Sequence, residues 1–174
     1  MVAGATKEGL CLLEFADRKS LQSQIDEVAG LLETTVEQGS NRFLRMVKKQ
    51  LKEYFKGKRK DFTVPLVNPG TEFQLAVWKE LLKIPYGSVK TYQEQADLLK
   101  NPGSVRAVAH ANGSNRIAIL IPCHRVIGSD GHLIGYGGGL ERKRWLLDHE
   151  KKFSGKPVDL NLFLRIGTHS YYKK

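Results

Sequence analysis

Hydrophobic residues recur at helical spacing in several stretches of the chain, separated by polar segments. In the first part, Ser20–Leu32 and Asn41–Phe55 have this spacing, and Gly57 ends the second stretch. Leu10–Phe15 and Phe62–Leu66 favour short strands, and a strand partner before the first of them is expected to be short or missing. The first part of the chain is therefore predicted to mix helices and strands.

Pro69-Gly70 interrupts this pattern and is the best candidate for a boundary between subdomains. Thr71 is predicted to cap the next helix, whose apolar residues are Phe73, Val77, Trp78, Leu81 and Leu82. A last helix, Leu140–Glu150, is expected to bury Trp145, Leu146 and Leu147. We expect an N-terminal subdomain over 1–68, a C-terminal subdomain over 69–150 and a tail over 151–174, in which Leu160–Ile166 could add a strand or short helix.

Two short helices joined by a tight turn are predicted between these segments. Thr91 can cap Tyr92–Leu99, the run Asn101-Pro102-Gly103 turns the chain, and a second helix runs from Ser104 to about Ala111. This is a helix-turn-helix candidate that carries Arg106 near the start of its second helix. Short helical pairs also occur in enzymes that bind no DNA, so the pattern alone leaves both interpretations open.

An apolar run leads directly into a tetrapeptide that contains a cysteine next to a histidine. Arg116–Ile121 predicts a buried strand, and Pro122-Cys123-His124-Arg125 follows it. A cysteine acts as a nucleophile when a neighbour lowers its pKa, which His124 and Arg125 could do, and Glu150 could orient the histidine. The Cys-His pair could equally be a coincidence in a structural strand.

Charge and composition narrow the classes of partner. The net charge of +10 favours an anionic partner, although half of it lies in the tail. The stretch Leu98–Ser129 has no acidic residue, so its basic side chains could face a phosphate backbone: Lys100, Arg106, Arg116 and Arg125. Two cysteines are too few for a disulfide scaffold, and no Cys/His cluster has metal-ligand spacing.

Neither a membrane segment nor a signal peptide is visible in the sequence. No apolar run approaches the roughly 20 residues that span a bilayer, and the first residues lack the succession of a secretion signal. An intracellular protein is expected, cytoplasmic if the source is prokaryotic and nuclear if it is eukaryotic.

The run IPCHRVIGSDGHLIGYGGGLERKRWLLDHE, with TEFQLAVWKELLKIPYGSVKTYQEQADLLKNPGSVRAVAHANGSNRIAIL before it, resembles the methylated-DNA–protein-cysteine methyltransferases, or O6-alkylguanine-DNA alkyltransferases. The resemblance is dense over 69–150 and loose over 1–68. It implies an α/β (α+β) fold, with an RNase H-like N-terminal subdomain and a mostly helical C-terminal subdomain that carries a helix-turn-helix. It also implies single-turnover alkyl transfer from duplex DNA, bound through its minor groove, by a monomer without cofactor or metal.

The resemblance also implies a role for individual residues. Cys123 matches the alkyl acceptor, His124 the base that takes its proton through a water, Glu150 the carboxylate that orients the histidine, and Asn115 the residue that stabilises the turn. Arg106 matches the arginine that enters the duplex, and Tyr92 the tyrosine that presses on the 3′ phosphate and helps to rotate the nucleotide out. Further expected DNA contacts are Gln93, Asn101, Ser129 and, from its charge, Arg125; expected walls of the base pocket are Val126, Tyr136, Gly137 and Gly138.

Small departures from the family pattern suggest that the alkyl groups accepted include ones larger than methyl. Gly137 and Ala118 stand where many or some relatives have other residues, which suggests an open pocket that accepts groups larger than methyl. Three other classes remain as alternatives: a lesion-binding protein without transfer, a helix-turn-helix regulator and a Cys–His hydrolase. The intact Cys123 disfavours the first class, the acceptor motif is needless in the second, and the DNA-reading segment is unexplained in the third.

Overall fold

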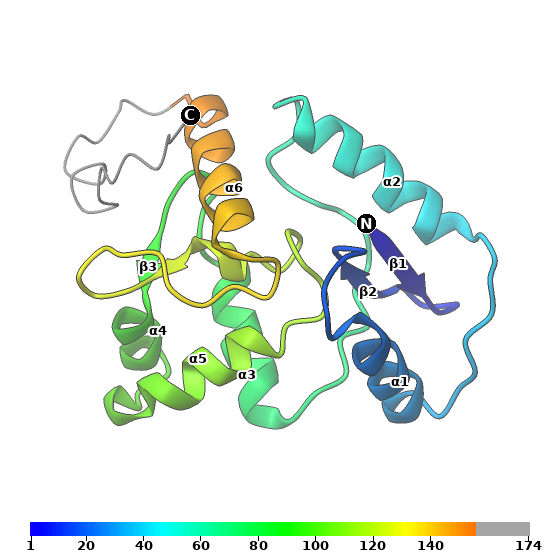
Figure 1. The fold of residues 1–174 in the computed structure, drawn as a ribbon, viewed down its shortest axis with the longest axis horizontal. Helices are drawn as coiled ribbons and strands as arrows, with labels where there is room; N and C mark the ends of the chain where they lie inside the picture. Colours follow the sequence, from blue (N-terminus) through cyan, green and yellow to red (C-terminus); the bar gives the residue numbers. More distant parts are fainter. Residues whose placement is uncertain (156–174) are drawn as a thin grey trace.

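The computed structural model describes residues 1–155, and its first sixty residues form one side of the molecule (Figure 1). β1 (Val2–Ala5) pairs antiparallel with β2 (Leu10–Glu14), while α1 (Leu21–Leu31) packs against β2 and α2 (Arg42–Phe55) against β1. The partner of the Leu10 strand, expected to be short or missing, is present and short: β1 has four residues, which pair along the length of β2.

The helix α2 begins where the sequence predicts it to begin. The side chain of Asn41 accepts hydrogen bonds from the backbone N–H groups of Phe43 and Leu44, which satisfies donors that the first turn leaves free. One face of α2 is buried in the core, through Phe43, Val47, Gln50, Leu51 and Tyr54. The opposite face is exposed along its whole length.

The second half of the described chain is mostly helical. It comprises α3 (Glu72–Leu82), β3 (Lys90–Thr91), α4 (Tyr92–Leu98), the 3₁₀ turn η1 (Pro102–Ser104), α5 (Val105–Gly113), the 3₁₀ turn η2 (Cys123–Arg125), β4 (Val126–Ile127) and α6 (Leu140–Phe153). Thr71 and Thr91 both form complete capping boxes, with Gln74 and Glu94. The expected α/β fold with a mostly helical second half is confirmed.

A two-residue parallel ladder sets the position of the cysteine segment. Lys90 pairs with Val126 and Thr91 pairs with Ile127. β3 continues directly into α4, and β4 follows directly from η2. The ladder therefore fixes the start of the α4–η1–α5 pair beside the segment that carries Cys123.

The segment before the cysteine is buried, but the expected strand over Arg116–Ile121 is wrong. Within residues 1–155 its only pairing is a single bridge between Ile117 and Leu13, and Ile119 has a left-handed backbone with φ of 72°. The side chain of Asn115 accepts from the backbone N–H of Ile117, which turns the chain at its start. An apolar run therefore indicated burial here without indicating strand geometry.

Two further expectations are corrected by the structure. Phe62–Leu66 forms no strand and pairs with β2 only through a bridge between Leu66 and Leu10, because Pro65 has no N–H to donate to a ladder. Trp145 is 51% exposed, while Leu146 and Leu147 are buried as expected. Trp145 instead stacks on His149 at the surface of α6.

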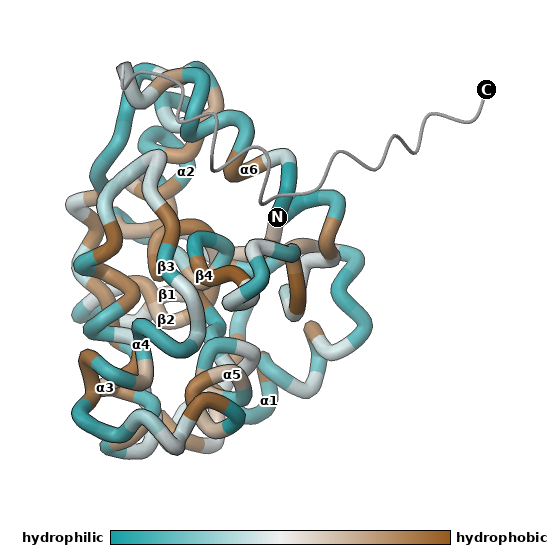
Figure 2. Tube along the Cα trace, turned by 90° about the vertical axis from the view of Figure 1, so that its left-hand side faces the viewer, coloured by the Kyte–Doolittle hydropathy of each residue, from teal (hydrophilic) through white to brown (hydrophobic). Residues whose placement is uncertain are grey.

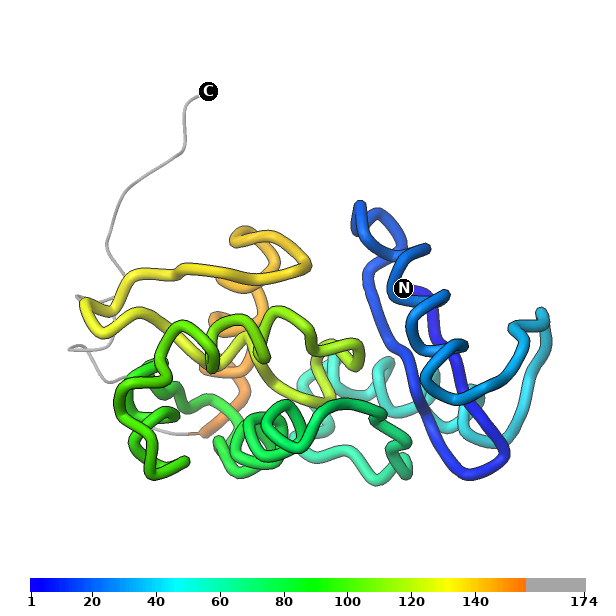
Figure 3. Tube along the Cα trace, turned by 90° about the horizontal axis from the view of Figure 1, so that it is seen from below, coloured from blue at the N-terminus to red at the C-terminus, as the bar shows by residue number. Residues whose placement is uncertain are grey.

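Both halves of the chain contribute to one hydrophobic core. Leu13 and Tyr54 from the first half belong to the same buried cluster as Trp78, Ile121 and Leu146 from the second. The halves lie side by side when the molecule is seen from below (Figure 3). In Figure 2, hydrophobic residues at β4 lie in the middle of the molecule, between α2 and α5. No helix within residues 1–155 combines the length and apolar character needed to cross a membrane, and the expected tail element Leu160–Ile166 lies outside the described residues.

Candidate active site

Cys123 begins η2 and is held by Asn115. The side-chain amide of Asn115 donates to Sγ of Cys123 at 3.2 Å and to the backbone oxygen of Ile121 at 2.8 Å. Asn115 is itself buried, so its orientation is fixed by these bonds and by the bond it accepts from Ile117. The coil that precedes the thiol is thus closed by one side chain.

His124 and Glu150 form a fully buried pair behind the cysteine. Nε2 of His124 lies 2.9 Å from Oε1 of Glu150, and neither side chain has exposed surface. Burial lowers the pKa of His124, so the ring is neutral near pH 7. An ionised carboxylate only accepts hydrogen bonds, so Nε2 carries the proton and Nδ1 keeps a lone pair. Nδ1 is buried and has no hydrogen-bond partner in the described chain.

Glu150 accepts hydrogen bonds from four residues, which lie in three parts of the chain. Besides His124, it accepts from Nε and Nη2 of Arg125 at 2.8 and 2.9 Å, from the hydroxyl of Tyr54 at 2.8 Å and from the backbone N–H of Gly87 at 3.1 Å. Burial alone would raise the pKa of Glu150, but the hydrogen bonds from His124 and Arg125 and the charge of Arg125 outweigh it and hold that pKa well below its ordinary value. The carboxylate is therefore charged inside the core.

The expectation that Arg125 faces a phosphate backbone is contradicted by its position. Its side chain is buried, pairs with Glu150 and donates to the backbone oxygen of Ile84 at 2.6 Å. Arg116 is also buried, where it bonds Glu27 and the backbone oxygen of Pro69. Of the four basic residues in the stretch Leu98–Ser129, only Lys100 and Arg106 are exposed.

The thiol of Cys123 is not activated in the way expected from its neighbours. Burial raises its pKa, while the bond from Asn115 and the charge of Lys143 act in the opposite direction without overcoming it. Arg125 is occupied with Glu150, and His124 is neutral. In this state Cys123 is a thiol that needs a base to remove its proton.

A narrow cleft reaches Cys123 between the two halves of the chain. Its lining comprises Glu14, Arg18, Asn112, Gly113, Asn115, Ala118, Cys123, Tyr136, Gly137 and Gly138. Arg18 donates to the carboxylate of Glu14 and to the backbone oxygen of Gly113 at 3.2 Å. A Cβ at Gly137 would clash with the guanidinium of Arg18. The space that Gly137 was expected to leave open is therefore filled by a guanidinium.

The glycine-rich loop over 135–139 is anchored by side chains from α4 and α6. Nζ of Lys143 donates to the backbone oxygens of Ile134 and Gly135 at 2.6 and 3.1 Å, and the hydroxyl of Tyr92 contacts the same two oxygens. Arg142 donates to Gly138 and pairs with Asp17, which ties the loop to the N-terminal half. Tyr136 is half-buried and packs edge-on against Phe15.

The residues expected to contact DNA fall into two groups. Arg106, Gln93, Asn101 and Ser129 are exposed; Tyr92 is buried under the loop. Gln93 donates to Asp97 and to the backbone oxygen of Pro102, so it also links α4 to η1. Val126 is buried beside η2. Within residues 1–155, no three His, Cys, Asp or Glu side chains are grouped as a metal site would require.

The sequence interpretation missed four residues at this site. Glu14 and Arg18 line the cleft, Tyr54 bonds Glu150, and Lys143 anchors the loop. Lys143 had a signal, since it lies three residues before the buried Leu146 on one face of α6. The other three reach the site from the first half of the chain, and no local pattern marks such contacts.

Comparisons with known proteins agree with this geometry. The family model described as "6-O-methylguanine DNA methyltransferase, DNA binding domain" matches residues 72–152, and the one described as its "ribonuclease-like domain" matches residues 1–67. A methylated-DNA–protein-cysteine methyltransferase of Mycobacterium tuberculosis is 56% identical over 114 residues, which are 66% of this chain and 68% of the relative. The inducible methyltransferase of Bacillus subtilis is 51% identical over 107 residues, which are 62% of this chain and 60% of the relative.

Solved structures give the same result over most of the chain. The crystal structure of Mycobacterium tuberculosis OGT in complex with DNA has a TM-score of 0.73 and 42% identity, and covers 92% of this chain and 91% of that one. The O6-methylguanine-DNA methyltransferase of the archaeon Pyrococcus kodakaraensis has a TM-score of 0.60 and 30% identity, with 83% and 88% covered. Because the family models match both parts of the sequence and these relatives cover it so fully, the chain belongs to the O6-methylguanine DNA methyltransferase family.

Proposed function

We propose that this chain repairs DNA by moving an alkyl group from O6 of a damaged guanine onto Sγ of Cys123, once per molecule. The observation that carries the proposal is the buried His124–Glu150 pair next to a thiol at the end of a cleft. Its relatives are named methylated-DNA–protein-cysteine methyltransferases, and one of them was solved in complex with DNA. DNA is accordingly the partner of this chain.

The proposed chemistry uses His124 as a base. A water passes the proton of Cys123 to Nδ1 of His124, which is the ring atom without a partner in the described chain. The thiolate attacks the alkyl carbon, an S–C bond forms, and the C–O6 bond breaks with its electron pair moving to the oxygen. The guanine then takes up the proton through the same water. Glu150 stabilises the transient imidazolium, as a buried carboxylate does for a catalytic histidine.

Single turnover follows from the product. The sulfur leaves the reaction as a thioether, and a thioether is a poor leaving group. Removing the alkyl group would need a second nucleophile beside the sulfur. Asn115 is the side chain that donates to Sγ, and an amide is not such a nucleophile.

Damaged guanine must leave the duplex stack to reach Cys123, because a base in a stack does not expose O6 to a buried thiol. We assign the α4–η1–α5 pair to the duplex, with Arg106 filling the gap that the rotated nucleotide leaves. Ala107 and Ala109 are small and exposed on α5, so the helix can approach a minor groove closely. Gln93, Asn101 and Ser129 are assigned further contacts. Tyr92 is assigned the 3′ phosphate, which requires the loop over 135–139 to move away from its hydroxyl.

The remaining parts of the proposal concern organisation. Residues 1–68 and 69–150 are assigned to two subdomains, with Val126, Tyr136, Gly137 and Gly138 as walls of the base pocket. The protein acts as a monomer on O6-alkylguanine, in whichever compartment holds the DNA.

The test is the mass of the intact protein after it is mixed with excess duplex that contains one O6-methylguanine. The proposal expects a gain of one methyl group per chain, never more, and no gain in Cys123→Ser. Retained lesion binding without a gain in mass would instead assign the chain to the lesion-binding class. A gain in the Cys123→Ser variant would show that another residue accepts the methyl group.

A further inference from the structure

The net positive charge of the described chain is concentrated on α2 and the turn that follows it. Residues 42–61 carry nine Lys or Arg and two acidic residues. The other 135 described residues carry fifteen basic and fifteen acidic residues. The excess of seven positive charges within residues 1–155 therefore lies on this one segment.

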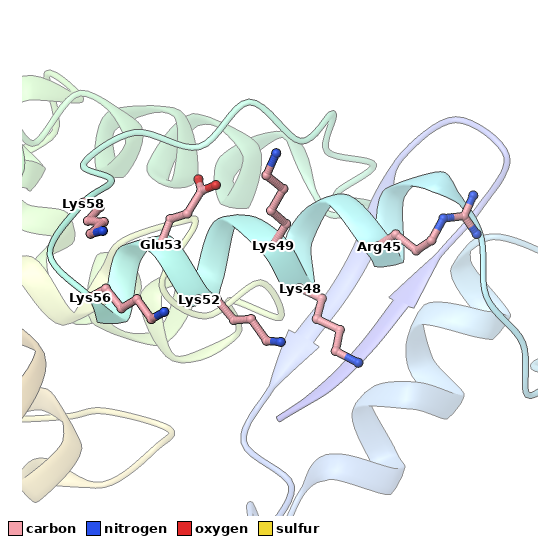
Figure 4. A pocket seen from close by; sticks show the side chains of 7 residues that line it. All are labelled: Arg45, Lys48, Lys49, Lys52, Glu53, Lys56 and Lys58. Carbon is pink, nitrogen blue, oxygen red and sulfur yellow. The ribbon is translucent and has the colours of Figure 1, made fainter.

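Five exposed residues make up the basic face of α2: Arg45, Lys48, Lys49, Lys52 and Lys56. Figure 4 shows Lys48, Lys52 and Lys56 extending from the same side of the helix, and Lys49 from the other side. Together with Glu53 and Lys58 they line a shallow groove along α2. The single carboxylate there, Glu53, pairs with Arg59 at 2.6 Å and so does not neutralise the basic face.

Two features of this arrangement work against the stability of the helix, although Lys52 in the last turn is favoured by the helix dipole. Lys48, Lys52 and Lys56 are spaced four residues apart, so like charges repel along the face. Arg42 and Arg45 lie in the first turn, where the helix dipole favours acidic groups, and that turn has none. Among residues 1–155, no acidic side chain forms an ion pair with the basic face. An external polyanion would relieve all three conditions.

The basic face lies far from the proposed lesion-binding helices. Figures 1 and 2 show α2 at one end of the molecule and α5 at the opposite end, in views a quarter-turn apart. A straight duplex bound across α4, η1 and α5 therefore does not reach α2. A lipid surface is a poor match, because helices that bind membranes insert their apolar face, and that face of α2 is buried in the core.

We propose that the basic face of α2 binds the phosphate backbone of a second DNA segment while α4–η1–α5 holds the first. The nine residues from Lys48 to Lys56 span about 12 Å of helix axis, which matches three or four phosphates along one strand. Contacts of this kind are independent of sequence and sensitive to salt. Two such faces let one molecule pass from segment to segment without returning to free solution. The proposal rests on the proposed function only for the identity of the first face.

The test mixes the full chain with two undamaged duplexes that carry different fluorophores, so that energy transfer reports complexes holding both. Wild type and the control Lys7→Gln/Lys19→Gln, which removes two exposed lysines elsewhere, are expected to bridge the duplexes. Lys48→Gln/Lys52→Gln removes the same charge and retains helix propensity, since Gln is a good helix former. It should bridge about tenfold more weakly, with a salt slope lower by about two.

Methyl transfer to a short lesion duplex is measured in parallel with the same variants. An unchanged transfer rate in Lys48→Gln/Lys52→Gln, together with lost bridging, supports a separate second face. Equal bridging by this variant and the control would overturn the proposal. A parallel loss of methyl transfer would also overturn the proposal, because it would make α2 part of the lesion-binding face. Binding of anionic vesicles without bridging of the duplexes would overturn it as well. Because bridging uses undamaged DNA, its outcome is separate from whether Cys123 accepts a methyl group.

Discussion

The guanidinium of Arg18 packs directly on the backbone of Gly137, at the mouth of the cleft that leads to Cys123. Arg18 is anchored there by Glu14, Ser20 and the backbone oxygen of Gly113. Under the proposed function, a flipped base that enters the cleft is expected to displace Arg18. The N-terminal half of the chain therefore narrows the cleft through this side chain.

Arg18→Ala should accelerate the reaction of Cys123 with the free base O6-benzylguanine. If the closed cleft outnumbers the open one by about ten to one, the rate rises up to about tenfold, because the reactive fraction limits the observed rate. The gain in mass of the intact protein over time measures this rate. Arg45→Ala, an exposed arginine on α2, serves as control. A slower reaction in Arg18→Ala would show that Arg18 helps to bind the base.

Glu150→Gln should both destabilise the protein and slow transfer. The change leaves the buried Arg125 without its counter-charge and His124 without a fixed tautomer. Breaking a buried ion pair on one side costs about 3 kcal/mol or more. Urea unfolding measures the stability, and Glu141→Gln, in the exposed first turn of the same helix, should change it by less than about 0.5 kcal/mol. Equal stability of the two variants would contradict the structural role of Glu150.

The rate of transfer should depend on pH in a way set by His124 and Cys123. His124 must be neutral to accept a proton, and burial lowers its pKa below the ordinary 6.5, so activity should fall only below that pH. Burial raises the pKa of Cys123 above 9.0, so no thiolate-driven increase is expected below pH 9. Single-turnover rates between pH 5 and 9 test this. If the transfer rate already declines above pH 7 as the pH is lowered, the result would argue against a buried neutral base.

Lys143 should make the protein more stable as the pH rises from 8 towards 10. Burial lowers its pKa to about 8, against 10.5 for an exposed lysine. Between these values the unfolded chain binds one proton more than the folded chain, so the free energy of unfolding rises by up to about 1.4 kcal/mol per pH unit. Below pH 8 both states hold the proton and the contribution is constant.

Urea unfolding of Lys143→Met at several pH values isolates this contribution. The stability of wild type relative to the variant should increase across the window from pH 8 to 10 and stay level from pH 6 to 7.5. Lys152→Met, at an exposed position on the same helix, should show no such trend. A difference independent of pH would mean that Lys143 remains charged in the folded protein.

Arg106→Ala should slow repair of duplex DNA and leave the reaction with free O6-benzylguanine unchanged. Arg106 is exposed on α5 and lies outside the cleft lining, so in its proposed role it acts on the duplex and not on a base already in the cleft. Loss of the side chain that fills the gap should lower the duplex rate by about tenfold or more. An equal effect on both substrates would show that Arg106 acts on the cleft itself.

Local chemistry explains which parts of the fold could be predicted. The helices that follow Asn41, Thr71 and Thr91 begin as expected because one side chain satisfies free backbone donors at each start. The strand prediction for Arg116–Ile121 failed because an apolar run indicates burial and not backbone geometry. The turn there depends on the side chain of Asn115.

Contacts distant in sequence explain the rest. Arg18 and Gly113 are 95 residues apart, and Tyr54 and Glu150 are 96 residues apart, so no spacing could place them together. The basic face of α2 was not visible in the net charge of the first half of the chain. Residues 1–41 carry seven acidic and three basic residues, and this acidic excess offsets the basic residues of α2 in the total.

The hydrogen bond from Tyr54 to Glu150 makes the acceptor site depend on the position of α2. An insertion that tilts this helix would pull the phenol from the carboxylate, and selection would detect the change as slow repair. Residues 33–40, which connect α1 to α2, are exposed throughout and have no such tie. We therefore expect insertions and substitutions within residues 33–40 to leave repair unchanged, whereas changes on the inner face of α2 should reach the acceptor site through Tyr54.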